Sequence, residues 1–194
     1  MIKNLNKASD ESLVKEILKD PENLNFLINR YWQQLFFFVR RISYFSSEDT
    51  EDILQEVFIK VYKNINSFDS SYKFSTWIFQ ITRNTTIDAI RKKTSRPQEF
   101  SLDKNDLRQI LVESGIDIEE KIINKEKVKI IEEIIRSLPF KYQEVMILKF
   151  LEEKTYEEMV DIIKKPKGTV ASLLNRGKAL FKKQAIIKGL AIEN

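Results

Sequence analysis

The sequence predicts an all-α protein: two small helical domains joined by an acidic linker, the C-terminal one containing a helix-turn-helix. The 194 residues include only four Gly and four Pro, so helix-breaking residues are scarce. Apolar residues recur at helical spacing along most of the chain. Between residues 98 and 126, eight acids stand against four bases, a net charge of −4. Because the net charge of the whole chain is +4, the residues outside this segment carry a net charge of +8. We place the domains at 1–95 and 125–194 and the linker at 96–124.

Successive helices are expected throughout the first domain. Ser9 can cap a short helix that ends before Pro21. A longer helix over about 22–43 is apolar nearly all round, so we expect much of it to be buried. Further helices are expected over about 47–65 and 75–93.

The helix over 47–65 combines an apolar stripe with a dense group of acids. The stripe predicts its core side: Ile53, Leu54, Val57, Phe58, Val61, Tyr62 and Ile65. The acids are Glu48, Asp49, Glu51, Asp52 and Glu56. Favourable interaction with the helix dipole explains the first few. Asp52 and Glu56 lie four residues apart, where like charges repel mildly, and a protein partner with a basic surface would account for them.

A loop over 67–73 precedes the next helix, whose far end is basic. Aromatic rings beside cationic side chains suit single-stranded nucleic acid, because bases stack on rings while cations hold phosphates. Phe68 and Phe74 are more readily explained as core residues, whereas Tyr72 fits either interpretation.

Residues 155–183 have the form of a helix-turn-helix. Thr155 and Glu158 make a capping box for the first helix. The segment from Lys164 to Gly168 is a short break, and a second helix with apolar residues at helical spacing follows. From 162 to 192 there are eight Lys or Arg and no Asp or Glu, which favours DNA binding over an ordinary αα-hairpin.

Three segments together resemble the bacterial RNA polymerase sigma factors. DTEDILQEVFIKVY (49–62) resembles their polymerase-binding helix, and FSTWIFQITRNTTIDAIRKK (74–93) resembles the helix that reads and melts the −10 promoter element. LPFKYQEVMILKFLEEKTYEEMVDII (138–163) resembles the start of their C-terminal domain. The match covers about 20–95 and 125–183, and the short segment between points to the extracytoplasmic function (ECF) group.

The resemblance implies a site for each step of promoter recognition. Contacts to core RNA polymerase are expected from Glu51, Asp52, Gln55 and Glu56. Contacts to the melted −10 element are expected from Tyr72, Lys73, Asn84, Asp88, Arg91 and Lys92, with the 67–73 loop receiving a flipped base. Contacts to the duplex −35 element are expected from Lys167, Thr169, Ser172, Asn175, Arg176 and Lys178. Many relatives are held inactive by an anti-sigma factor, which makes such a factor a candidate partner here.

The second helix of the helix-turn-helix departs from the family pattern. Ala171 and Leu173 stand where Lys or Arg is common, and Leu173 is expected to be exposed. Lys164 replaces a turn glycine and is expected to adopt positive φ, while Lys165 replaces an apolar residue. Basic charge has moved from the helix into the turn, so phosphate contacts can persist while base readout differs.

Composition narrows the remaining options. The chain has no Cys and no His, so we expect no cofactor, no metal site and no enzymatic activity. No signal peptide or membrane span is evident, which predicts a cytoplasmic protein. Two alternatives stay open: a stand-alone helix-turn-helix regulator, and a metal-dependent nuclease using Asp49, Asp52 and Glu56. The tail after Lys183 can extend the last helix, pack on the domain or bind a partner.

Overall fold

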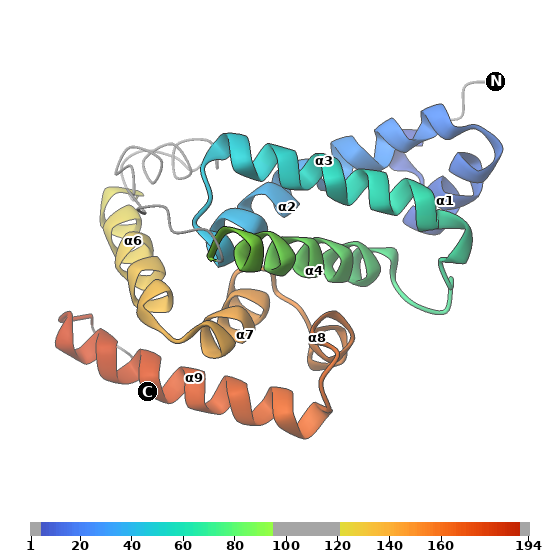
Figure 1. Ribbon diagram of the computed structural model, residues 1–194. Helices are drawn as coiled ribbons and strands as arrows, with labels where there is room; N and C mark the ends of the chain where they lie inside the picture. The colour runs from blue at the N-terminus through green and yellow to red at the C-terminus, as the bar shows by residue number, and fades with distance from the viewer. Residues whose placement is uncertain (1–4, 95–120, 191–194) are drawn as a thin grey trace. The chain divides into compact units, whose positions relative to one another are not determined.

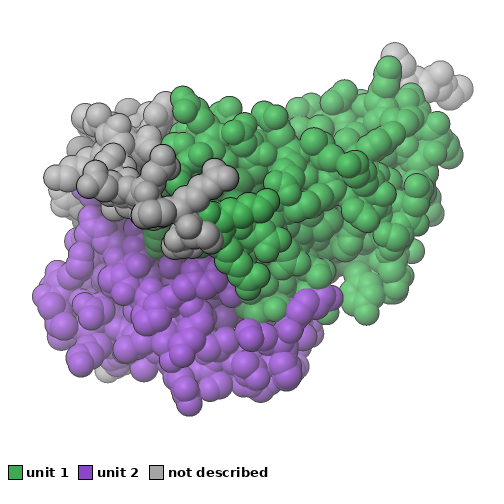
Figure 2. Space-filling view, in the orientation of Figure 1, with its two compact units in different colours: residues 1–99, 161–163 green, residues 100–160, 164–194 purple. Residues whose placement is uncertain are grey.

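The computed structural model describes residues 5–94 and 121–190, which form helices and connecting loops with no β-strand among them (Figure 1). These residues group into two compact units (Figure 2). The first contains η1 to α4, and the second contains α6 to α9, except that Asp161–Ile163 at the end of α8 are grouped with the first. The predicted fold class is therefore confirmed.

The first unit is built around three long helices. Its elements are η1 (Leu5–Lys7), α1 (Asp10–Lys19), η2 (Pro21–Asn23), α2 (Leu24–Ser43), α3 (Ser47–Asn64), η3 (Ile65–Ser67) and α4 (Phe74–Thr94). Helices α2, α3 and α4 each pack against the other two, and α1 packs against α2, α4 and η3 (Figure 1). The fully buried side chains that join these helices include Leu27, Leu35, Phe38, Leu54, Phe74 and Phe79.

Local signals in the sequence set where these helices begin. Ser9 caps α1, because its hydroxyl accepts a hydrogen bond from the Ser12 backbone N–H at 3.3 Å. Ser46 caps α3 in the same way through the N–H of Asp49 at 3.1 Å. Each cap satisfies a backbone donor that the first turn of a helix leaves unpaired. Pro21 follows directly after the end of α1, as predicted.

The predicted core side of α3 is correct except at its far end. Ile53, Val57 and Val61 are buried, whereas Tyr62 is 46% exposed, so the prediction that Tyr62 belongs to the core is wrong. Ile59, which lies three residues before it, is 51% exposed. Helical spacing places Tyr62 at the edge of the stripe, and neither α2 nor α4 covers that edge.

The second unit consists of α6 (Lys121–Ser137), α7 (Phe140–Phe150), α8 (Tyr156–Ile163) and α9 (Lys167–Ile187). Helix α9 packs against α7 and α6. Gly177 allows the closest approach, since a Cβ atom there would lie 3.1 Å from Met146 Cγ on α7. Residues 96–120 of the predicted 96–124 linker lie outside the described residues. The remaining four, 121–124, belong to the first turn of α6.

Residues 184–187 extend α9, which was one of the three options for the segment after Lys183. Gly189 adopts φ 71°, and the Leu190 N–H donates to the Ala185 carbonyl at 2.9 Å while the Gly189 N–H donates to the Ile186 carbonyl at 3.1 Å. This pair of bonds is the Schellman motif that ends many helices. Lys188 also forms an ion pair with Glu133 on α6 at 2.8 Å, which fastens the helix end to the unit.

Candidate nucleic-acid and polymerase surfaces

The acids predicted to contact polymerase lie on the solvent side of α3. Glu51, Asp52, Gln55 and Glu56 are all exposed, and the buried residues Ile53, Leu54, Val57 and Phe58 occupy the opposite side. We call these four exposed residues the acidic face. Within the described parts of the chain, Glu51 and Asp52 make no ion pair. Their charges are therefore left available to another molecule.

Two of the five acids of α3, Asp49 and Glu56, are held by lysines of the same unit. Glu56 pairs with Lys60 at 2.7 Å, and the Lys60 ammonium also donates to the Thr85 hydroxyl on α4 at 3.0 Å. Asp49 pairs with Lys93 of α4 at 2.8 Å. The hydrogen bond from Lys93 holds the pKa of the Asp49 carboxyl below its usual value. Asp49 is thus part of the packing between α3 and α4.

The aromatic residues around the 67–73 loop divide into packed and exposed rings. Phe68, Phe74 and Trp77 form a cluster with ring centroids 5.3–5.6 Å apart, and Phe74 is fully buried. The core role expected for Phe74 is confirmed, whereas Phe68 is half-buried and packs its ring against Phe74 and Trp77. Tyr72, in contrast, is 53% exposed.

A tight turn shapes the loop itself. The Asp69 carboxylate accepts the Ser71 backbone N–H at 2.9 Å, and the Tyr72 N–H donates to the Asp69 carbonyl at 3.1 Å. The backbone hydrogen bond from Ser71 lowers the pKa of the Asp69 carboxyl. An aspartate that closes a turn on its own backbone in this way presents the following residues in a defined conformation.

Helix α4 has a buried side that carries several threonines and an exposed side that carries polar and charged residues. Thr82, Thr85 and Thr86 are buried, and each hydroxyl donates to the carbonyl four residues earlier at 2.8–2.9 Å. These bonds satisfy the hydroxyls within the helix. The predicted −10 residues Asn84, Asp88, Arg91 and Lys92 are exposed, and so are Tyr72 and Lys73 before the helix.

Charge on this side of α4 increases toward the end of the helix. Arg91 stands 3.6 Å from Asp88, and both side chains are more than half exposed. Such a pair in water contributes little to stability, so Arg91 can exchange its partner for a phosphate at small cost. A cation at a helix end is also favoured by the helix dipole.

The second unit contains the predicted helix-turn-helix in α8, residues 164–166 and α9. The capping box is confirmed: the Glu158 N–H donates to the Thr155 hydroxyl at 3.2 Å, and the Thr155 N–H donates to the Glu158 carboxylate at 2.8 Å. Lys164 adopts φ 56° and ends α8 in the left-handed conformation, which confirms the expectation for the residue that replaces the turn glycine. A non-glycine residue carries a steric penalty in this conformation.

All six residues predicted to contact the −35 element are exposed on α9: Lys167, Thr169, Ser172, Asn175, Arg176 and Lys178. Val170 and Leu174 are fully buried on the other side of the helix. Leu173 is only half-buried, so the expectation that it would be exposed is wrong. It adjoins the buried stripe, which partly covers it.

Two of the lysines on α9 already have partners in the free protein. Lys167 pairs with Glu157 on α8 at 2.7 Å, and the hydrogen bond between them lowers the pKa of Glu157 and raises the pKa of Lys167. The Lys178 ammonium lies 5.6 Å from the centre of the exposed Phe150 ring on α7. These contacts restrain long side chains that would otherwise be freely mobile.

Sequence reasoning did not assign Ile59 and Tyr62 to a surface. Both continue the acidic face along α3, since Gln55, Ile59 and Tyr62 are separated by four and three residues. This spacing could have identified them. The carboxylates suggested for a nuclease are not gathered into a metal site, and the described residues contain no group of three or more His, Cys, Asp or Glu that could hold a metal ion.

Comparison with known proteins identifies the family of the chain. Residues 27–96 match the family model for sigma-70 region 2, and residues 129–181 match the model for sigma-70 region 4. The ECF RNA polymerase sigma factor SigW of Bacillus subtilis is 38% identical over 143 residues, covering 70% of this chain and 75% of SigW. The ECF RNA polymerase sigma-E factor of Escherichia coli K12 is 32% identical over 180 residues, covering 89% and 92%.

Solved structures of low sequence identity share the fold. CnrH, in complex with the cytosolic domain of CnrY, matches with a TM-score of 0.66 and 16% identity, covering 95% of this chain and 100% of that chain. The sigma factor RpoE of Bartonella quintana, in complex with the anti-sigma factor NepR, matches with a TM-score of 0.61 and 15% identity, covering 86% and 98%.

The two region matches define a sigma-70-type initiation factor. With the relatives above, they show that the chain belongs to the ECF RNA polymerase sigma factors. Its function is promoter-specific initiation of transcription, and the stand-alone regulator is not favoured. None of the helices in the described parts of the chain is long and apolar enough to cross a membrane.

Proposed function

We propose that this sigma factor divides its work among three surfaces, one for core RNA polymerase and two for promoter DNA. One observation carries the assignment. Each predicted set of residues is exposed on or directly before its own helix, on the side away from the buried apolar stripe of that helix. Exposed polar side chains outside the core are candidates for binding.

The polymerase surface is the acidic face of α3 with its apolar extension, Ile59 and Tyr62. Carboxylates attract a basic partner and orient it, because opposite charges steer association. The exposed isoleucine and tyrosine then bury apolar area in the complex, and tyrosine is a residue type enriched at such interfaces. The combination fits a helical, basic protein surface better than it fits DNA, whose phosphates the carboxylates would repel.

The −10 surface consists of the loop ending at Lys73 and the exposed side of α4. Tyr72 offers a ring for stacking, and Asn84 offers donors and acceptors for a base edge. Arg91 and Lys92 would hold phosphates and so place the strand along the helix. Opening the duplex costs a few kcal/mol for each extruded base, which stacking in such a site offsets.

The −35 surface is the exposed side of α9. Arg176 can bind a guanine edge in the major groove with two hydrogen bonds, or can bind the adjoining phosphate. Thr169 and Ser172 offer hydroxyls at the N-terminal end of the helix, where recognition helices contact bases. Lys167 would exchange its ion pair with Glu157 for a DNA phosphate.

Partners and place of action follow from the same assignment. The chain would act in the cytoplasm, where its relatives work with RNA polymerase, and the proposal assigns no catalytic residue to it. An anti-sigma factor is a candidate regulator, since the RpoE of similar fold is seen with one.

A run-off transcription assay tests the proposal. Core RNA polymerase is incubated with and without this protein on DNA from upstream of its own gene, and binding to core is followed on a sizing column. We expect a discrete transcript that requires both components. A protein that neither moves with core nor yields a transcript on any upstream template would refute the proposal, and tight binding to duplex DNA by the protein alone would then support the regulator.

A further inference from the structure

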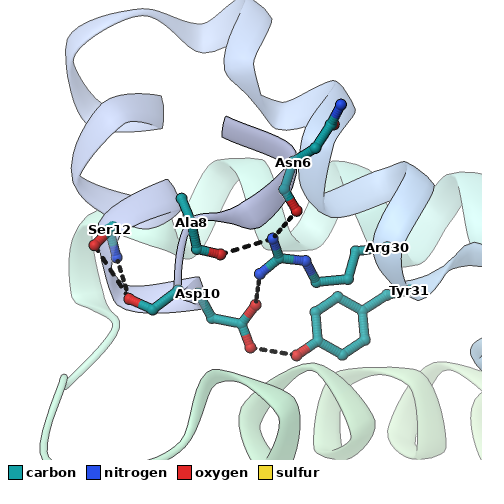
Figure 3. A network of polar contacts seen from close by, with 7 residues as sticks. Asn6, Ala8, Asp10, Ser12, Arg30 and Tyr31 are labelled. Atoms are coloured by element: carbon teal, nitrogen blue, oxygen red, sulfur yellow. Dashed lines mark hydrogen bonds and ion pairs between the residues drawn. The ribbon is translucent and has the colours of Figure 1, made fainter. Parts of the chain in front are cut away.

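A partly buried polar network in the first unit connects the residues before α1 and the start of α1 to α2 (Figure 3). The Arg30 guanidinium donates to the Asp10 carboxylate at 2.5 Å and to the backbone carbonyls of Ala8 and Asn6 at 2.7 and 3.2 Å. The second oxygen of Asp10 accepts the hydroxyl of Tyr31. The Arg30 guanidinium, both Asp10 oxygens and the Tyr31 hydroxyl thus each have a hydrogen-bond partner, and a network satisfied in this way holds its side chains in place.

The hydroxyl of Tyr31 is fixed as a donor. The side chain is only 6% exposed. Burial, and then the hydrogen bond to Asp10, raise the pKa of the Tyr31 phenol well above its usual value. The proton therefore stays on the phenol, and the Asp10 carboxylate orients the ring.

The other side of the Tyr31 ring faces the aromatic cluster at the 67–73 loop. Its centroid lies 5.7 Å from that of Phe74, the first residue of α4. Phe74 in turn lies 5.5 Å from Phe68 and 5.6 Å from Trp77. Phe68 and Phe74 stand at the two ends of the segment that carries Tyr72. Helix α1 also packs against η3, which leads into this segment.

We infer that Tyr31 is a positioning residue for promoter opening. Held by Asp10, it fixes the position of the Phe74 ring and thereby the conformation of the 67–73 loop. This role rests on the proposed function of that loop. A phenylalanine would fill the same space, so packing alone does not require the hydroxyl. The Asp10 carboxylate and the Arg30 guanidinium are partly buried, and polar groups held in this way can be retained because they select one arrangement of the elements they join.

Tyr31→Phe tests the inference, because it removes only the hydroxyl. Trp77 reports on the loop, and replacing Trp32 with Phe makes Trp77 the single tryptophan of this chain. In this background we expect Tyr31→Phe to shift Trp77 emission to longer wavelength and to increase its quenching by acrylamide. Asp10→Asn, which removes the charged acceptor, should act in the same direction.

Activity of the holoenzyme gives the second readout. On a duplex promoter, we expect Tyr31→Phe to lower the rate of opening about three- to tenfold, as expected for partial loss of a hydrogen bond to a charged group. Affinity for core should stay within about twofold, since Tyr31 is buried away from the acidic face. A template melted in advance over the −10 element should restore most of the loss.

Ile17→Val is the matched control. Ile17 is buried in α1 but belongs to neither the polar network nor the aromatic cluster, and this change removes one methyl group from the core. We expect it to leave Trp77 emission and promoter opening unchanged. If Tyr31→Phe affects both no more than Ile17→Val does, the network only anchors α1 and the inference is wrong.

Two further outcomes would overturn the inference in different ways. A parallel loss of core affinity would place the effect of Tyr31 outside promoter opening. If the wild-type protein neither moves with core nor yields a transcript on any upstream template, the sigma role itself fails, while the Trp77 signal still reports whether Tyr31 and the loop are coupled.

Discussion

Reversing two charges on the acidic face is the sharpest test of the polymerase surface. Asp52→Lys combined with Glu56→Lys replaces two exposed carboxylates without touching the buried side of α3. The fold should survive, because the only described ion pair lost is the half-exposed one between Glu56 and Lys60. An i,i+4 pair of this kind contributes about 0.3–0.5 kcal/mol, and the new like-charge pair costs a similar amount.

The loss in binding should be much larger than the loss in stability. If each carboxylate contributes about 1 kcal/mol of attraction to a basic partner, and each new lysine adds a similar repulsion, the double reversal costs about 4 kcal/mol. That free energy corresponds to about a thousandfold in affinity. The effect should shrink at high salt, because the charges are exposed and the Debye length falls.

Affinity for core polymerase is measured by titrating labelled protein at two salt concentrations, with circular dichroism melts alongside. Glu11→Lys combined with Glu22→Lys is the matched control, since both side chains are exposed and the net charge changes equally. We expect this control to bind core nearly as the wild type does. Equal affinity of the wild type and the Asp52, Glu56 variant would show that α3 does not contact polymerase. Equal losses in both double variants would show that only net charge matters.

Four further predictions concern the remaining contacts. Arg176→Ala should weaken binding of the holoenzyme to −35 DNA by about 1–3 kcal/mol in a mobility-shift assay while core affinity stays constant; a loss of core affinity would instead indicate a protein-binding role. Gly177→Leu should destabilise the second unit by about 1–3 kcal/mol in thermal melts, because even a Cβ atom added at this position would lie 3.1 Å from Met146 Cγ on α7. An unchanged melting temperature would mean that α7 and α9 move apart easily. Lys164→Gly should raise stability by up to about 1 kcal/mol, since the lysine has φ 56°; a decrease would show that its side chain has a stabilising contact. Asp49→Asn should make the free energy of unfolding decrease less as the pH is lowered into the acid range. The hydrogen bond from Lys93 lowers the pKa of Asp49 in the folded state, so the stabilising contribution of Asp49 is present above the ordinary value of 3.8 and is lost as the pH falls below it. The same loss of stability in acid for the variant and the wild type would contradict this prediction.

The helices and their ends were predictable because local interactions determine them. Ser9, Thr155 and Glu158 act on backbone groups within three residues, so their caps can be identified from sequence spacing alone. The positive φ of Lys164 was predicted from the resemblance, because this residue stands where the family has a turn glycine. The exposure of the acidic face followed from the apolar stripe on the other side of α3.

The errors lie at the edges of helical stripes. Tyr62 was placed in the core and is exposed, whereas Leu173 was expected in solvent and is half-buried. Spacing along one helix fixes the direction of a side chain relative to its neighbours on that helix. It does not show how far the adjoining helices extend, and this extent decides whether an edge position is covered.

The sequence by itself determined an all-α chain, the position of most helices, the helix-turn-helix and the three sets of residues proposed to bind. Only the tertiary structure showed that Lys93 holds Asp49, that Lys60 reaches Thr85, and that Asp10 holds Tyr31 beneath the 67–73 loop. These partners are 44, 25 and 21 residues apart in the chain. Helical periodicity predicts which residues of one helix lie on the same side. Pairs between helices depend on how the helices pack, and each of these residues could have met many different residues of the other helix.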